Sequence, residues 1–229
     1  MRTTLTAAVF VCAGSTALAQ SVLLNFTRTD APDLAAYNEL RPNDAGLADL
    51  TDTTGAATGI ALTVANPFFD IGEASPLGSE SPSGDAAIFV PEATDTFHFG
   101  HTGPFAGEES NPLSVVTFGG LDPTFTYDFT IFASRQIVND LRETQYTLEG
   151  SNTLSGVLEP ANNNTDVLRL IGASPDANGE LSLSVEAGPA NNNGLQFYYI
   201  NALAIDIVPA PSTAALVLGA GVIAGRRRR

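Results

Sequence analysis

Phe125-Thr-Tyr-Asp-Phe-Thr-Ile-Phe-Ala133 is the clearest strand signal in this chain of 229 residues. Apolar side chains occupy every second position, and Thr or Asp fill the positions between them until Phe132. A period of two places alternate side chains on opposite faces of a sheet, so one face of this segment is expected to be buried. The stretch therefore predicts a strand of an antiparallel sheet with a packed inner face.

Comparable segments recur on both sides of this stretch. Leu181, Leu183 and Val185 alternate with polar residues in the same way. Further strands are expected at residues 21–27, 59–65, 87–90, 114–118, 145–149, 166–171 and 197–208. Two helices are expected, one at residues 32–40 with Asp30 as its cap, and one hydrophobic helix at the C-terminus. Short strands without alternating helices predict an all-β protein, an antiparallel β-sandwich or jelly roll over residues 20–207.

The chain is strongly acidic, and its positive charge is concentrated at the ends. It has no lysine, ten arginines and 25 acidic residues, which gives a formal net charge of −15. Arg2 and Arg226–Arg229 lie in the terminal segments, which leaves five arginines against 25 acidic residues, a net charge of −20, between them. Nucleic-acid binding depends on Lys and Arg neutralising phosphates, so we exclude a nucleic-acid partner.

Residues 1–19 have the layout of a secretory signal peptide. Arg2 provides the positively charged start, and an apolar stretch follows. Ala17-Leu18-Ala19 is an A-x-A cleavage motif before Gln20. Cys12, the only cysteine, lies inside this segment. The exported chain would therefore contain neither disulfides nor thiolate metal ligands.

Residues 208–229 form a tripartite tail. Val208-Pro-Ala-Pro-Ser212 precedes an apolar run at residues 213–225 and the terminal arginines. As a hydrophobic helix, this run would rise only about 20 Å, less than the roughly 30 Å of a bilayer core. Such a tail can be a signal that is read during export, a permanent membrane anchor or a buried terminal helix.

The order of these parts resembles the PEP-CTERM sorting signal, although Ala210 stands where that signal has glutamate. The resemblance implies a transient membrane anchor that an exosortase-like sorting enzyme recognises and cleaves. The residues that carry it are the two prolines and the basic cluster, namely Pro209, Pro211, Arg226, Arg227, Arg228 and Arg229.

Four segments in the second half of the body carry another resemblance. They are Phe129-Thr-Ile-Phe-Ala-Ser-Arg135, Thr144-Gln-Tyr-Thr-Leu-Glu-Gly150, Gly179-Glu-Leu-Ser-Leu-Ser-Val185 and Tyr199-Ile-Asn-Ala-Leu-Ala-Ile205. Their order is similar to that of galactose-binding-like jelly-roll domains of exported, sorting-tagged bacterial proteins. The resemblance implies the fold and sugar binding, but it assigns no role to any single residue.

Aromatic platforms and planar polar groups are the side chains that would hold a sugar. The predicted ligand-binding residues are Arg135, Asn139, Asp140, Arg142 and Tyr146. Tyr127, Tyr198 and Tyr199 are further aromatic candidates. The alternative is that the tyrosines fill the core and that the arginines pair with the surplus of acidic residues.

The sequence offers little for catalysis. His98 and His101 could bind a metal with Asp95 or Glu92, but on a strand their side chains would point to opposite faces. No Gly-x-Ser-x-Gly elbow is present, and a phosphate loop would need a lysine. Paired carboxylates remain an alternative, because 25 acidic residues offer many pairs. A structural calcium ion at Asp122, Asp128, Asp166 and Asp176 is a second hypothesis.

Pro-Ala-Asn-Asn-Asn occurs twice, at residues 160–164 and 189–193, each time ahead of an expected strand. Asn tolerates left-handed turns, so the repeat is interpreted as one loop solution used twice. Taken together, the sequence predicts an exported, non-enzymatic protein of the cell envelope or extracellular matrix. Its expected role is structural or adhesive, with extracellular polysaccharide as partner. The alternative is a secreted polysaccharide hydrolase with paired carboxylates.

Overall fold

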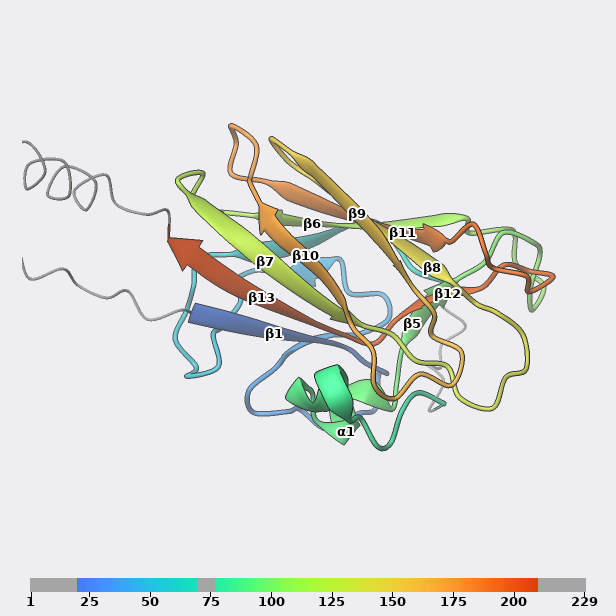
Figure 1. Ribbon diagram of the computed structural model, residues 1–229. Coiled ribbons are helices and arrows are strands. Elements are labelled where there is room, and N and C mark those ends of the chain that lie inside the picture. Colours follow the sequence, from blue (N-terminus) through green and yellow to red (C-terminus); the bar gives the residue numbers. More distant parts are fainter. Residues whose placement is uncertain (1–19, 70–76, 210–229) are drawn as a thin grey trace, which may run out of the picture.

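The computed structural model describes residues 20–69 and 77–209, which form two antiparallel sheets packed as a β-sandwich, with a small third sheet at one end (Figure 1). The strands are β1 Gln20–Phe26, β2 Asn38–Leu40, β3 Gly46–Leu47, β4 Ala61–Asn66, β5 His98–Gly100, β6 Leu113–Gly119, β7 Phe125–Phe132, β8 Thr144–Glu149, β9 Thr153–Leu158, β10 Leu168–Ala173, β11 Leu181–Ala187, β12 Tyr198–Ile200 and β13 Ala202–Pro209. The helical segments are the 3-10 helix Gly84–Ile88 and α1 Pro91–Thr94.

The first sheet has the order β10-β7-β13-β1-β2. The strand predicted from the alternating stretch is β7, which pairs with β10 on one side and β13 on the other. Its residues Tyr127, Phe129 and Ile131 are buried in the core, as the period of two predicts. β2 is the exception to the antiparallel pairing, because it runs parallel to β1.

The second sheet has the order β3-β4-β6-β11-β8-β9. In β11, the alternation seen in the sequence puts Leu181, Leu183 and Val185 in the core and leaves the residues between them half-buried. Phe118 of β6 meets Phe129 of β7 edge to face, with ring centroids 5.4 Å apart, and this contact joins the two sheets. Each buried large side chain stabilises the sandwich by about 1.5–3 kcal/mol.

The outer face of the first sheet is covered near the end of β7. Phe132, which breaks the polar half of the alternation, packs against Phe89 with centroids 6.1 Å apart. Ala86, Ala93, Ala202 and Ala204 complete this second cluster. The segment that contains the 3-10 helix and α1 therefore explains why an apolar residue stands at an outward position.

Both ends of the described fold leave the sandwich at the same edge (Figure 1). Gln20 is the Cα partner of Ile207, and Pro209 is the partner of Phe125. The loop that follows β7 lies at the opposite end. At about 3.4 Å per residue, the eight residues of β7 separate the two ends by about 24 Å.

Two predictions about the first half of the chain are wrong. Residues 32–40 form turns and β2 instead of a helix, because Asn38 bonds across to neighbouring segments. Its amide accepts from Thr51 N and donates to the carbonyls of Leu23 and Thr51, at 2.8–2.9 Å. These tertiary hydrogen bonds override the local helix propensity.

Residues 87–90 form the end of the 3-10 helix and a loop, not a strand. Ala87 and Ile88 are exposed there, while Phe89 alone reaches the core. The apolar residues of this segment therefore do not form a buried strand.

Residues 1–19 and 210–229 lie outside the described residues, and so do the predicted signal peptide, the predicted C-terminal helix, Pro211 and Arg226–Arg229. Pro209 is described and ends β13. Within residues 20–69 and 77–209, no helix has the length and apolar character needed to cross a membrane.

Candidate functional site

The loop that follows β7, residues 134–143, carries four of the five predicted ligand-binding residues. The first Pro-Ala-Asn-Asn-Asn copy holds its first half. Arg135 N donates to Pro160 O at 2.7 Å, and Asn162 N donates back to Arg135 O at 2.9 Å. The Asn162 side chain then accepts from Ile137 N at 2.9 Å and donates to Val138 O at 2.7 Å.

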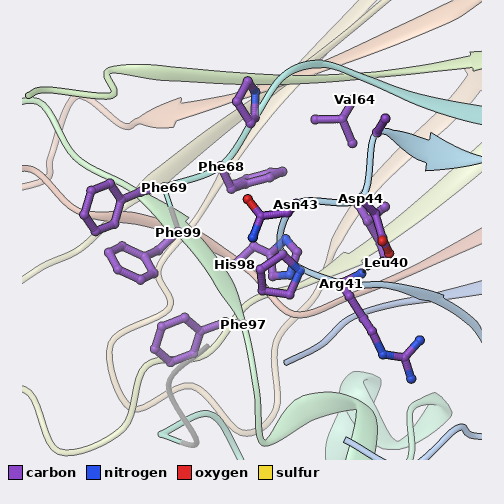
Figure 2. Close-up of a pocket in the computed structure, with 13 residues that line it drawn as sticks. Leu40, Arg41, Asn43, Asp44, Val64, Phe68, Phe69, Phe97, His98 and Phe99 are labelled. Atoms are coloured by element: carbon purple, nitrogen blue, oxygen red, sulfur yellow. Dashed lines mark hydrogen bonds between the residues drawn. The ribbon is translucent and has the colours of Figure 1, made fainter. Parts of the chain in front are cut away.

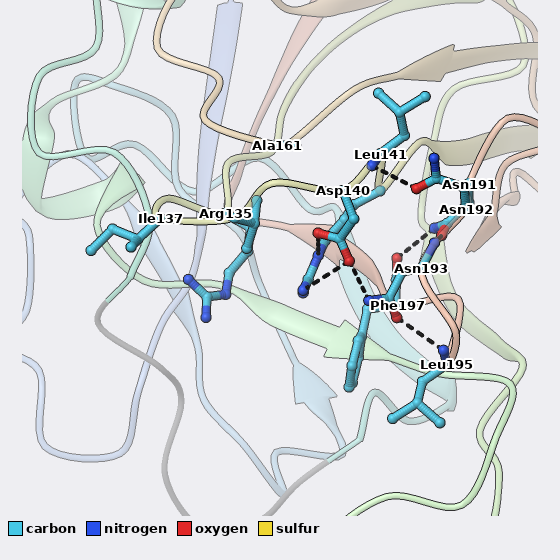
Figure 3. Close-up of polar contacts among 12 residues, drawn as sticks. Arg135, Ile137, Asp140, Leu141, Ala161, Asn191, Asn192, Asn193, Leu195 and Phe197 are labelled. Atoms are coloured by element: carbon cyan, nitrogen blue, oxygen red, sulfur yellow. Dashed lines mark hydrogen bonds and ion pairs between the residues drawn. The ribbon is translucent and has the colours of Figure 1, made fainter.

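The second copy holds the other half of the same loop (Figure 3). Asn192 and Leu141 exchange two hydrogen bonds, at 2.8 and 3.1 Å. The Asn193 side chain donates to the Asp140 carboxylate. Both copies thus hold the same loop, but they do so in different conformations. Asn162 has φ +54°, whereas none of the asparagines of the second copy has a positive φ, so the repeat is not one loop conformation used twice.

Beside this loop is a cavity of about 280 Å³ with an aromatic lining. Its lining residues are Phe97, Phe99, Phe105, Arg135, Arg142, Phe197 and Tyr199. Two pairs of rings lie edge to face with centroids 5.0 Å apart, Phe97 with Tyr199 and Phe105 with Phe197. The pairing of β5 with β12 puts Phe99 opposite Tyr199, and so assembles this lining from segments that are a hundred residues apart.

Arg142 is fixed firmly over the aromatic rings. Its Nε donates to Asp140 Oδ1 at 3.0 Å and its Nη1 donates to the Tyr199 hydroxyl. Its guanidinium carbon lies 5.3 Å from the Phe197 centroid and 5.8 Å from that of Tyr199. Burial lowers the pKa of Arg142, but its hydrogen bonds and charge interactions with Asp140 and Tyr199 together outweigh burial and raise the pKa above its ordinary value. Arg142 is therefore a permanent, oriented cation.

Asp140 is the matching carboxylate. Burial raises its pKa, but hydrogen bonds from Arg142 and Asn193 outweigh burial and hold the pKa below its ordinary value. Asp140 is thus ionised at neutral pH and neutralises one of the two arginines.

Arg135 stands in a different situation. Its guanidinium carbon lies 6.0 Å from the Phe97 centroid and one Nη donates to Gln136 O. Burial lowers its pKa, yet a guanidinium stays protonated in proteins. Among the described residues, the other body arginines, Arg28, Arg41, Arg142 and Arg169, lie within 4.0 Å of a carboxylate, and Arg135 does not.

The remaining predicted residues have other positions. Asn139 is exposed on the same loop. Tyr146 is fully buried, and its hydroxyl donates to Tyr199 O at 2.6 Å, so it supports the aromatic lining from below without reaching the cavity. Tyr127 and Tyr198 are also core residues. Of the tyrosines, Tyr199 alone lines the cavity.

A second hollow of about 330 Å³ shares Phe97 and Phe99 with this cavity (Figure 2). Its polar side chains have structural tasks: His98 Nε2 lies 2.9 Å from Thr27 O, and Arg41 points away from the rings and pairs with Asp33 at 2.6 Å. We take the hollow beside Arg135 and Arg142 as the candidate site, because two guanidiniums and five aromatic rings line it together.

The predicted metal ligands do not come together. Over residues 20–69 and 77–209, no group of three or more His, Cys, Asp or Glu side chains is arranged to hold a metal ion. Asp122 and Asp176 accept hydrogen bonds from backbone N–H groups of their own turns. His101 lies at a tight turn, where its Nδ1 is 2.5 Å from Gly103 O.

The phenylalanines of the site were not among the predicted residues. A signal was present, because Phe97-His-Phe99 and Phe197-Tyr-Tyr199 each repeat an aromatic with a period of two. Such spacing predicts a shared face, but does not predict that the two faces meet.

Comparison with known proteins finds distant structural similarity and no sequence match. No protein-family model matches the chain, and no curated protein matches its sequence. The extracellular domain of ANXUR1 from Arabidopsis thaliana is similar over 62% of this chain and 40% of its own, with 13% identity and a TM-score of 0.38. The ANX1 ectodomain from Arabidopsis thaliana is similar over 75% of this chain and 55% of its own, with 12% identity and a TM-score of 0.39. This chain therefore spans about half the length of the solved ectodomains to which it is similar.

Proposed function

We propose that this protein is an exported, non-enzymatic carbohydrate-binding protein of the cell envelope or extracellular matrix, with a structural or adhesive role. One observation carries the proposal: two guanidiniums and five aromatic rings line one cavity at the end of the sandwich. Rings present flat faces to sugar rings, and planar polar groups fix the hydroxyls. We propose further that the sandwich is of the galactose-binding-like jelly-roll type.

The cavity supports binding better than hydrolysis. A glycosidase needs two carboxyl groups about 5–9 Å apart across the sugar. Among the described residues, none that lines this cavity carries a carboxylate, and the neighbouring Asp140 is engaged by Arg142 and Asn193. The described lining of the second hollow includes one carboxylate, that of Asp44.

A glycan array probed with the purified protein tests this function. We expect binding to at least one class of extracellular polysaccharide, and loss of that binding in Phe197→Ala, which removes the ring beneath Arg142. Val157→Ala, which shortens an apolar side chain that is 44% exposed on β9, is the matched control and should bind normally. Absence of binding to every glycan would contradict the proposal.

We propose that residues 208–229 act as a sorting tail with an exosortase-like enzyme as partner, giving transient attachment to the membrane. The support is the order of prolines, apolar run and arginines in the sequence. Replacing Arg226–Arg229 by serine should redirect the protein between cell fractions. An unchanged distribution would contradict the sorting role.

A further inference from the structure

The candidate site has one positive charge that the described residues do not balance. Arg135 and Arg142 contribute two charges, and Asp140 compensates one of them. This surplus lies in a chain whose formal net charge is −15, where a carboxylate is the commonest neighbour of an arginine. A cation on an aromatic wall without its own carboxylate is a ready site for a ligand anion.

Three of the described turns around the site are capped by neutral side chains. Turns of this kind need a side-chain oxygen that accepts a backbone N–H two residues on, and Asp and Asn serve equally well. The two repeats use Asn for this: Asn163 accepts from Thr165 N at 3.1 Å, Asn191 from Asn193 N at 3.1 Å, and Asn193 from Leu195 N at 3.0 Å. Neutral caps thus stand where this acid-rich chain elsewhere uses aspartate.

The two glutamates near the loop are occupied by backbone groups. Glu159 accepts from Ala161 N at 2.8 Å and Arg142 N at 2.9 Å. Glu143 accepts from Ala190 N at 2.7 Å. Neither carboxylate lies within 4.0 Å of a described guanidinium, so neither replaces a ligand anion at Arg135.

We propose that the site selects an acidic sugar: a uronic acid residue whose carboxylate binds Arg135 while its ring lies against the aromatic lining. This inference rests on the proposed carbohydrate-binding function and names its ligand class. A carboxylate carries one negative charge, which matches the single surplus positive charge. Its planar shape fits the fork of a guanidinium. A cavity of about 280 Å³ offers room for a small ligand and is at the lower end of ligand-site volumes.

Calorimetric titration of the protein with uronate trimers tests the inference. The probes are trimers of mannuronate, glucuronate and galacturonate, each beside its methyl ester, which keeps the ring and removes the charge. We expect at least one acid to bind about 10- to 100-fold more tightly than its ester. Arg135→Gln should weaken binding of the acid far more than binding of the ester, and so remove that advantage. Arg169→Gln, which deletes an arginine on β10, is the matched control and should change neither.

A second pair of variants does not depend on removing Arg135. Ile137 is 84% exposed two residues further along the loop, at φ +61°. Ile137→Asp adds a carboxylate near Arg135, and Ile137→Asn adds an isosteric neutral group. We expect acid binding to be about 3- to 10-fold weaker in the Asp variant than in the Asn variant, with the difference shrinking in high salt.

The outcomes separate the two proposals. If esters bind as tightly as acids, or only neutral glycans bind, the acidic-sugar inference is overturned and the carbohydrate-binding function stands. A sulfated oligosaccharide that binds more tightly than every uronate also overturns it. If no acid, ester or neutral glycan binds, the carbohydrate-binding function itself fails. Circular dichroism and thermal melting show that each variant is folded.

Discussion

The two ends of the sandwich use the same strands but carry different chemistry. Where β1 begins and β13 ends, Asp52, Asp122 and Asp176 cap turns with their carboxylates. At the other end, Asn163 and Asn191 cap turns, and a pair of arginines faces the aromatic lining. Either side chain can form the turn, so the choice between them sets the local charge and leaves the backbone alone. The comparison shows how an acidic protein can keep a positive site.

The largest expected effect on stability is at Asn201, near the end of the sandwich that carries Arg135 and Arg142. Asn201 is fully buried, its side chain accepts from Ser134 N at 2.8 Å and donates to Thr94 O at 2.8 Å. Asn201→Ala leaves both partners buried without a bond, so we expect a loss of about 3 kcal/mol in the free energy of unfolding. Urea unfolding measures it. Asn178→Ala, in an exposed turn at the other end, should cost less than about 0.5 kcal/mol. Equal losses would contradict the difference between the ends.

A middle-sized effect is expected at Asp140. Asp140→Asn removes the charge that holds Arg142, whose side chain is only 13% exposed. We expect a loss of about 1–2 kcal/mol, because a mostly buried cation loses its partner. The control is Asp33→Asn, which breaks the pair with Arg41 at an aspartate that is 84% exposed and should be nearly neutral. Thermal melting at low and high salt distinguishes the two.

A pH effect is expected at the acidic end. Hydrogen bonds from the Thr54 and Gln20 side chains and from Ala56 N lower the pKa of Asp52 to about 2. Because this pKa is below its value in the unfolded chain, about 3.9, the stabilisation is complete above about pH 4 and is lost as the pH falls toward 2. Urea unfolding at pH 5, 3 and 2 should show a smaller acid-induced loss in Asp52→Asn than in the unchanged protein. An identical pH profile would contradict this.

The smallest effect is at Ile137. A β-branched residue at positive φ is strained, and Asn accepts this conformation more readily. Ile137→Asn should therefore raise the free energy of unfolding by about 0.5–1 kcal/mol. Val157→Asn, on β9 with 44% exposure, should lower it, because it weakens an ordinary strand. A loss of stability in Ile137→Asn would show that its side chain makes a contact worth more than the strain.

The sequence predicted the features that depend on neighbouring residues. The alternation at β7 and β11 is local, and so is the grouping of Arg135, Asp140 and Arg142 on one loop. The aromatic lining was missed because it depends on the pairing of β5 with β12, two short strands far apart in the chain. The helix expected at residues 32–40 failed for a related reason, since parallel pairing with β1 is invisible in that segment.

Gln20 and Pro209, the two ends of the described fold, lie at the same end of the first sheet, and this determines how the domain responds to mechanical force. Pulling Gln20 and Pro209 apart would unzip β1 from β13, loading one pair of hydrogen bonds at a time. A force applied between Pro209 and a ligand bound at Arg135 would instead act along β13 and β7. It would load their eight antiparallel residue pairs in shear. The molecule should therefore resist far higher tension through a bound partner than through its own termini, and single-molecule stretching in the two geometries would show the contrast.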